Sequence, residues 1–486
     1  MNNLLIVNLP KYDLNAPCAA TAALMGVAYD NDYKPYESDF NIYLHKNLNS
    51  EEWYELDLWP LLYTISDTLK SRILESWNKM LADNLPSGCK FLCISIFSYD
   101  SLHISKLILE EEKKKTKNYK IIVGGNGASS TFTDNGMSFS DWSINGGYVD
   151  HLVSGDGESA FASILTDGTN EYNLDELDTI PYPEYSEFDY NDYSERKIYI
   201  TSSRGCVRRC TYCDVNEIWP TFRYRDAQSI VNEIKKHFYE TGITDYDFTD
   251  SLINGSSSNF FKFNTLLAEE KEKNPDLRDI RYRGQSICKT QKSMPEEHFE
   301  AMHYAGCQQL TTGIESFSEQ IRTDMRKKFT NNDLDYYLEQ CGRWGIPNIF
   351  LMLVGYPTET EKNHRENCEG LHKYKKYSDS GVIELIRFGT TMKIVEGTPI
   401  AQPDMFKKLG LSFDEDYRLS DINFYWNSSV NPDNTLIARI RRRVELHEIC
   451  VELNYPQPRI DTELSKLKEL AKTIINNKDK INIKTL

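Results

Sequence analysis

Three cysteines near the middle of the chain have the spacing of a metal-binding loop. Cys206, Cys210 and Cys213 follow one another as Cys-x-x-x-Cys-x-x-Cys, directly after Arg204-Gly205. Three thiolates in one loop can bind one face of a 4Fe-4S cluster, which ordinarily takes four cysteines. The spacing therefore predicts such a cluster, with one iron left open for a ligand that is not a protein side chain.

A zinc site is the main alternative for these cysteines. Structural zinc usually takes four nitrogen or sulfur ligands, often arranged as Cys-x-x-Cys pairs. Neither a histidine nor a further cysteine occurs within twenty residues on either side of the loop. The residues favour the iron-sulfur cluster over zinc.

The cysteine loop follows the first of six strand-like runs that alternate with helical patterns. These runs are 197–202, 246–249, 279–283, 309–313, 348–354 and 384–388. Six strand-helix units predict an incomplete parallel barrel, and the sites of such barrels gather at the carboxyl ends of the strands. In one intervening helix, Ser293 and Glu296 predict a capping box and Gly306 predicts the end.

The first part of the chain predicts a second α/β unit. Strand-like runs at 4–9, 91–97, 120–123 and 151–154 surround a helical stripe at 101–117, which indicates a parallel crossover. We expect a Rossmann-like domain at 1–172, a linker rich in Asp, Glu, Tyr and Pro at 173–196, and the barrel at 197–401. Residues 402–486 are expected to be mainly helical, with helices at 436–453 and 462–478.

The segment 201–214, Thr-Ser-Ser-Arg-Gly-Cys-Val-Arg-Arg-Cys-Thr-Tyr-Cys-Asp, resembles the signature of the radical S-adenosylmethionine (SAM) superfamily. The resemblance implies that SAM chelates the open iron and that Tyr212 lies beside its adenine. Glu315 and Ser316, in Gly-Ile-Glu-Ser, resemble a family segment that reaches SAM.

Two further residues are candidates for SAM contacts. Gly355 begins Gly-Tyr-Pro-Thr-Glu-Thr, which resembles the family's Gly-x-Pro-Gly-Glu-Thr turn, although Thr358 replaces the second glycine. Asp250 ends the second barrel strand, where polar contacts to SAM are expected, and a helix cap is an equally good interpretation. Glu315 could likewise be a buried partner of an arginine or of the backbone.

The N-terminal domain resembles those of cobalamin-type radical SAM proteins. Ser95-Ile-Phe97 is followed after 26 residues by Gly124 and Gly125, and Gly127 lies close behind. Small residues at strand ends let a nucleotide tail approach the backbone. Val-Ser-Gly-Asp-Gly-Glu158 resembles the loop that closes this domain. Ser95, the three glycines and Glu158 are therefore candidate cobalamin contacts.

The cobalamin prediction has an open alternative. No histidine has an aspartate two residues before it, so the Asp-x-His-x-x-Gly loop that ligates cobalt in other cobalamin proteins is absent. The chain could methylate an unreactive carbon with cobalamin, or perform a cyclisation, rearrangement or oxidation without it. A non-catalytic iron-sulfur or zinc scaffold is the third possibility. No catalytic acid, base or second radical carrier stands out.

Composition limits the partners and the compartment. The net charge of −17 opposes binding to phosphate backbones, so nucleic acid is not expected. No run approaches the roughly 20 apolar residues of a membrane span, and no secretory leader is recognisable. We expect a cytoplasmic protein with reduced thiols. The resemblance implies a small-molecule or peptide substrate and an electron donor such as flavodoxin or ferredoxin.

Overall fold

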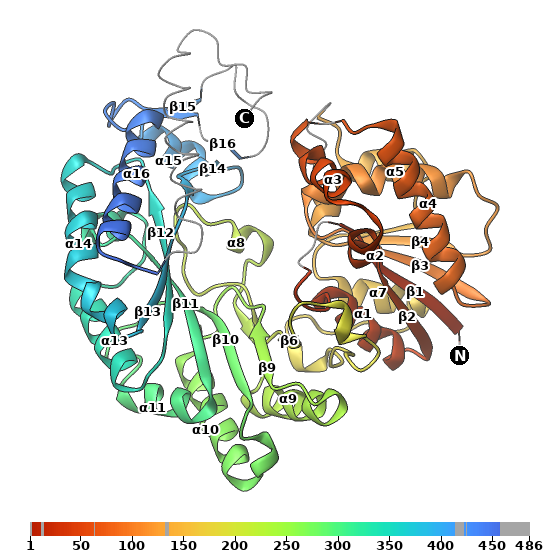
Figure 1. Cartoon of the computed structure of the whole chain (residues 1–486), viewed down its shortest axis with the longest axis horizontal. Helices are drawn as coiled ribbons and strands as arrows, with labels where there is room; N and C mark the ends of the chain where they lie inside the picture. Colours follow the sequence, from red (N-terminus) through yellow and green to blue (C-terminus); the bar gives the residue numbers. More distant parts are fainter. Residues whose placement is uncertain are drawn as a thin grey trace. The chain divides into compact units, whose positions relative to one another are not determined.

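The chain divides into two compact units and contains two large β-sheets (Figure 1). The computed structural model describes residues 2–10, 14–62, 64–131, 136–413, 422–423 and 425–456. The first unit consists of Met1–Ile200 and Asn232–Asp245, and the second of Thr201–Val231 and the chain from Tyr246 onward.

The sheet of the first unit has the strand order β2-β1-β3-β4-β5. Its strands are β1 (Asn2–Asn8), β2 (Tyr33–Asp39), β3 (Cys89–Ser95), β4 (Lys120–Gly124) and β5 (His151–Val153). All neighbouring strands pair in parallel, which confirms the predicted α/β class. In sheets of this order the strand sequence reverses between β1 and β3, and ligands bind at the carboxyl edge there.

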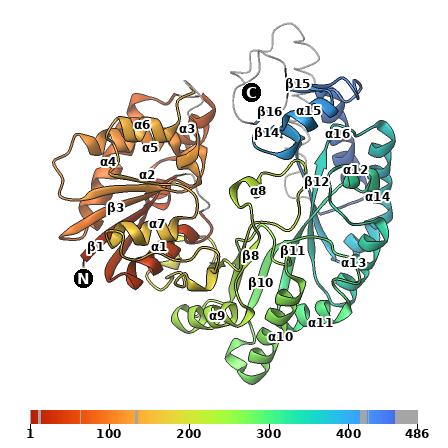
Figure 2. The same cartoon turned by 180° about the vertical axis from the view of Figure 1, so that it is seen from behind.

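Helices cover both faces of this sheet, with α1 and α7 on one face and α4 and α5 on the other (Figures 1 and 2). Leu5 and Val7 of β1 point to the same face, where they join a core that includes Trp77 of α4 and Ile108 of α5. The helices are α1 (Ala19–Asp30), α2 (Phe40–Asn47), α3 (Ser50–Leu62), α4 (Asp67–Asn84), α5 (Leu102–Lys113), α6 (Phe139–Asn145) and α7 (Gly157–Leu165).

The second sheet has the strand order β13-β12-β11-β10-β9-β6. Its strands are β6 (Lys197–Ile200), β9 (Asp245–Phe248), β10 (Arg281–Ser286), β11 (Cys307–Glu315), β12 (Asn348–Val354) and β13 (Ile383–Thr391). The pairs from β10 to β13 are parallel, and every strand overlaps a predicted run. The expectation of a partial six-stranded barrel is confirmed. The short strands β7 (Ser203–Arg204) and β8 (Arg223–Tyr224) pair with each other beside the cysteine loop.

Helices line the outer face of the partial barrel, and the C-terminal helix α16 packs against α14 and β13 (Figure 1). The helices that follow β6 are α8 (Val215–Ile218), α9 (Ala227–Thr241), α10 (Ser257–Lys273), α11 (Glu296–Ala305), α12 (Glu319–Asp324), α13 (Asn331–Arg343), α14 (Glu361–Asp379), α15 (Pro403–Lys408) and α16 (Leu436–Glu452), and not all of them belong to the outer layer. Four short strands, β14 (Ile394–Val395), β15 (Leu411–Phe413), β16 (Ile422–Asn423) and β17 (Trp426–Ser428), precede α16. The predicted helix at 462–478 lies outside the described residues.

The start of α11 differs from the predicted capping box. Pro295 occupies the N-cap position and makes no side-chain cap, while the Ser293 hydroxyl donates to the Thr290 carbonyl oxygen at 3.1 Å. The predicted capping box is therefore wrong, because the Ser293 hydroxyl closes a turn at 290–293 and does not cap the helix. The predicted end is confirmed, because Gly306 adopts φ +91°, a conformation that favours glycine.

Candidate active site

The cysteine loop is anchored at Thr211 by three separate segments of the second unit. The Thr211 backbone N–H donates to the Met325 carbonyl at 3.2 Å, and its carbonyl accepts from the Ile400 N–H at 2.8 Å. Its hydroxyl lies 2.8 Å from the hydroxyl of Tyr356, in the turn after β12. These bonds fix the middle of the loop, between the second and third cysteines.

Asp250 holds the start of the loop. Its buried carboxylate accepts from the Ser202 N–H at 3.0 Å and the Ser202 hydroxyl at 3.0 Å, and also from the Ser203 N–H. Burial raises the pKa of Asp250 to about 6, although these hydrogen bonds act in the opposite direction. The structure thus gives Asp250 a positioning role at the loop, and a direct contact to SAM stays a prediction.

Glu315 forms an ion pair with Lys327, whereas the alternative expected from the sequence was an arginine or the backbone. The Lys327 ammonium lies 2.8 Å from Glu315 Oε1 and donates to the Gly313 carbonyl at 3.2 Å. It also lies 5.8 Å from the centre of the Tyr212 ring. A side chain at Gly313 would meet Glu315 Oε1 at 2.6 Å, so the absence of a side chain there gives the pair its room. Tyr212, Glu315 and Lys327 therefore form one cluster beside the loop.

The backbone at Glu315 is unusual for a residue other than glycine. Its φ is +64°, and the pairing of β11 with β12 shifts register between Gly313 and Glu315. Such conformations cost about 1–3 kcal/mol and gather at functional sites. The local strain is consistent with a carboxylate that is held in place for a ligand.

The thiols of the loop share one electrostatic environment. Cys210 is buried, while Cys206 and Cys213 are partly exposed, and all three are free of disulfides. Burial raises the pKa of Cys210, and the nearby Lys327 opposes this shift. Burial, together with the charges of Cys210 and Cys206, raises the pKa of Cys213 to about 11. Clustered thiols of this kind suit a cation that displaces their protons.

Ser316 and Gly355 lie at the carboxyl ends of the adjacent strands β11 and β12, and both have structural contacts. The Ser316 hydroxyl donates to Asn367 Oδ1 at 2.8 Å and is fully buried. Gly355 adopts φ +88°, and a Cβ there would lie 2.3 Å from Arg439 Cδ. Position 355 therefore needs a glycine so that Arg439 of α16 can pack against it. The contacts of Ser316 and Gly355 with SAM remain predictions.

Four of the five candidate cobalamin residues line one pocket of the first unit. Ser95, Gly124, Gly125 and Glu158 surround a cavity of about 170 Å³ at the carboxyl ends of β3 and β4, between α1 and α7. A Cβ on Gly125 would lie 2.4 Å from the Ile96 carbonyl oxygen, and its φ is +105°. The cavity lies at the carboxyl edge of the sheet, where open α/β sheets bind ligands, and it is next to the switch point between β1 and β3 and not at it.

Gly127 is outside that lining. A Cβ there would lie 2.4 Å from the Ser98 carbonyl oxygen, so Gly127 lets two loops at the edge of the sheet pack together. The remaining lining comes from small or apolar residues of α1, β3, β4, β5 and α7, such as Ala23 and Phe161. Gly124 and Gly125 pack against Val153 and Ile96, whereas open space lies beside Gly155 and Gly157 of the lining. That space leaves room for an extended group such as the nucleotide tail of a cobalamin.

The partial barrel with three cysteines at its mouth defines a class of iron-sulfur proteins, and comparison with known sequences identifies the family of that region. Residues 200–369 match the Radical SAM superfamily. The chain is 25% identical over 283 residues to the tRNA-2-methylthio-N(6)-dimethylallyladenosine synthase of Clostridium novyi (strain NT). The match covers 56% of this chain and 56% of that protein, so the chain spans about half the length of this curated relative.

Two solved structures share the fold over both units. The radical SAM methyltransferase TsrM from Kitasatospora setae, with tryptophan and aza-SAM bound, aligns with a TM-score of 0.60 and 16% identity over 85% of this chain and 79% of its own. The cobalamin-dependent SAM radical enzyme OxsB, with aqua-cobalamin and SAM bound, gives a TM-score of 0.63 and 14% identity over 98% and 71%. The chain therefore carries the domain of a radical SAM enzyme within the fold of the cobalamin-dependent type, which favours an enzyme over a non-catalytic scaffold.

In the part of the chain that the structure describes, we find no helix that combines the length and the apolar character of a membrane span.

Proposed function

We propose that this chain is a cobalamin-dependent radical SAM methyltransferase that acts on an unactivated carbon of a small-molecule or peptide substrate. The glycine-lined pocket of the first unit carries the cobalamin part of this proposal. The cysteine loop, with Tyr212, Glu315 and Lys327 beside it, supports the radical SAM part. The charge of −17 makes nucleic acid an unfavourable substrate, even though the curated relative is named for tRNA.

The residues have separable roles in this proposal. Cys206, Cys210 and Cys213 would hold the cluster, and Glu315 and Lys327 would orient the amino and carboxylate groups of SAM through their opposite charges. When bound, the cluster with SAM supplies a 5'-deoxyadenosyl radical and cobalamin supplies a methyl carrier. The ring of Tyr212 would lie along the adenine, and an electron donor such as flavodoxin or ferredoxin would reduce the cluster in the cytoplasm.

The main competing function is a radical SAM cyclisation, rearrangement or oxidation without cobalamin. Both functions need the cluster, so only the pocket of the first unit distinguishes them. Ala23 lines that pocket from α1, whereas Ala19, one turn earlier on the same helix, does not. A tryptophan at each position therefore gives a blocked pocket and a matched control.

The test uses the full chain, purified anaerobically and reconstituted with iron and sulfide, in the presence of aqua-cobalamin. We expect cobalamin absorption bands in the wild type and in Ala19→Trp, and their loss in Ala23→Trp with the iron-sulfur absorbance unchanged. S-adenosylhomocysteine, the product left when SAM gives up its methyl group, should form only where cobalamin binds. If the wild type forms 5'-deoxyadenosine but binds no cobalamin, the competing function is correct.

A further inference from the structure

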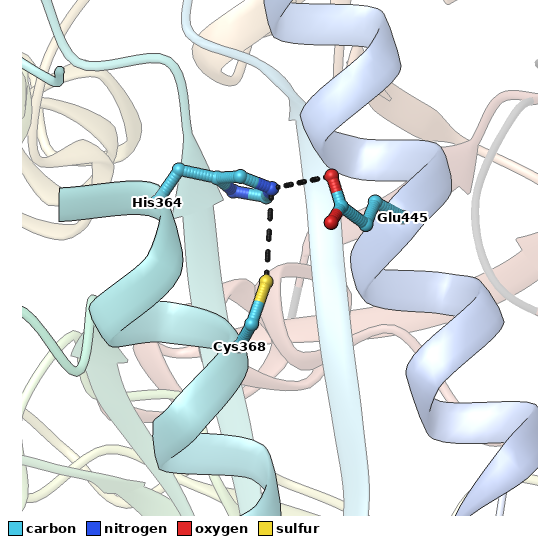
Figure 3. A group of neighbouring side chains, drawn as sticks. All are labelled: His364, Cys368 and Glu445. Carbon is cyan, nitrogen blue, oxygen red and sulfur yellow. Dashed lines mark hydrogen bonds and ion pairs between the residues drawn. The ribbon is translucent and has the colours of Figure 1, made fainter. Parts of the chain in front are cut away.

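Three potential metal ligands meet between helices α14 and α16, within the second unit and apart from the three loop cysteines. His364 and Cys368 are one helical turn apart on α14, so both point to the same side, and Glu445 faces them from α16 (Figure 3). His364 Nε2 lies 2.9 Å from Glu445 Oε2 and 3.7 Å from Cys368 Sγ. All three donor atoms lie within 4.8 Å of one another.

These distances are close to those of a mononuclear zinc site. Zinc binds cysteine sulfur at about 2.3 Å and nitrogen or oxygen at about 2.0–2.2 Å, so ligand atoms of a tetrahedral site are about 3.4–3.6 Å apart. The His364–Glu445 distance of 2.9 Å would need to grow by about half an ångström to reach this geometry, while Glu445 and Cys368 are within 4.8 Å of each other. Side-chain rotation allows such adjustments. Imidazole, thiolate and carboxylate are the side chains that zinc prefers.

The surroundings leave the three ligands available. The imidazole of His364 is fully buried, and within the described residues its Nε2 contacts only the other two ligands, Cys368 and Glu445. Cys368 and Glu445 are partly exposed, which gives an ion a way in.

The nearest arginine is not a strong competitor for Glu445. Arg441 lies 3.7 Å from the Glu445 carboxylate but only 2.6 Å from that of Glu361. It can therefore keep Glu361 as its partner when Glu445 turns to a cation. A thiolate and a carboxylate together balance the two charges of a zinc ion, so the loaded site would be neutral at a half-buried position.

We propose that His364, Cys368 and Glu445 bind one zinc ion, with water as the fourth ligand. On binding, the Cys368 thiol releases its proton to solvent, and the His364 ring carries its proton on Nδ1 so that Nε2 binds the ion. The ion joins α16 to α14, whose first residue directly follows the turn 355–360. It therefore stabilises the helix that packs on Gly355 through Arg439.

The test measures zinc in the full chain after reconstitution of the cluster and removal of loosely bound metal. We expect about one zinc per chain in the wild type and at least a fivefold loss in both Cys368→Ser and Glu445→Gln. Cys450→Ala and Glu448→Gln are matched controls on α16, and they should keep zinc. The iron content and circular dichroism of every variant should match the wild type, which separates loss of the site from misfolding.

Two further readouts exclude binding at the loop cysteines. The triple variant Cys206→Ala, Cys210→Ala, Cys213→Ala should lose iron but retain zinc. Cobalt(II) added to this triple variant should give a thiolate charge-transfer band that disappears when Cys368→Ser is added. The proposal is wrong if the wild type holds no zinc, or if Cys368→Ser and Glu445→Gln hold as much as the controls, in which case the residues form only an ion pair.

Discussion

Loss of one partner of the Glu315–Lys327 ion pair should loosen the second unit by an amount that can be calculated. The charged atoms are 2.8 Å apart, and the two side chains are 12% and 7% exposed. At an effective dielectric constant of about 20, the attraction is about 6 kcal/mol. Desolvation of both charges offsets much of this when the pair forms, but removal of one partner leaves the other charge buried, at a cost of about 3–5 kcal/mol.

Hydrogen exchange measures this loss for each unit separately, which matters because the two units need not unfold together. Peptides that cover β11 should exchange roughly a hundredfold to several thousandfold faster in Glu315→Gln and in Lys327→Met, since each 1.4 kcal/mol changes the rate tenfold. Peptides of β3 in the first unit should not change. Lys328→Met is the matched control, because Lys328 is the exposed neighbour of Lys327.

The double variant decides whether the two charges act as a pair. When both are replaced, no charge remains buried, so the double variant should lose less stability than the sum of the single variants by at least about 2 kcal/mol. Additive losses, or single variants that exchange like Lys328→Met, would refute the buried pair.

The remaining predictions concern the cluster, a buried carboxyl and the cobalt centre. Cys210→Ala should abolish both the iron-sulfur absorbance and the formation of 5'-deoxyadenosine, whereas Cys450→Ala should retain them; retention of both in Cys210→Ala would contradict the cluster assignment. Burial raises the pKa of Glu359 from 4.5 to about 7. Because a raised carboxyl pKa stabilises the fold only while the group is protonated, stability should fall by about 3 kcal/mol between pH 4.5 and 7. The melting temperature measured across this pH range should fall less steeply in Glu359→Gln than in the wild type. An unchanged slope would contradict the assignment of this pH dependence to Glu359. The electron paramagnetic resonance spectrum of bound Co(II) should lack splitting by a nitrogen ligand. His45 is the histidine to exclude as that ligand; it is exposed and lies edge-on to Trp53, with 5.0 Å between the ring centres. Triplets that vanish in His45→Ala would overturn this prediction.

The sequence predicted the strands of both sheets well because most of them are continuous apolar runs. Strand β12, for example, reads Asn-Ile-Phe-Leu-Met-Leu-Val and was expected with its observed bounds. Strand β2 was not predicted, since Tyr33–Asp39 contains Pro35 and the charged residues Lys34, Glu37 and Asp39. It lies at the edge of its sheet, where proline and polar residues are tolerated and local patterning is weak.

The candidate sites show the same limit at the level of single residues. The three cysteines could be found because their ligands lie within one loop. Lys327 could not, because tertiary folding and not spacing brings it back to Glu315. His364 and Cys368 have a visible spacing of four, but Glu445 is 77 positions beyond Cys368 and joins them only when α16 packs on α14.

The packing of α16 against the turn after β12 limits which segments of this enzyme could be exchanged with those of related proteins in a chimaera. Arg439 rests on the Trp426 ring at 3.7 Å and fills the space beside Gly355, and Arg442 donates to the Glu359 carbonyl at 3.1 Å. Arg442 also lies 3.9 Å from the Glu359 carboxylate, so a chimaera joined at residue 401 would remove this partner and open a gap behind Gly355. A chimaera that transfers substrate preference should therefore fold only when the turn 355–360 and α16 both come from the same parent protein.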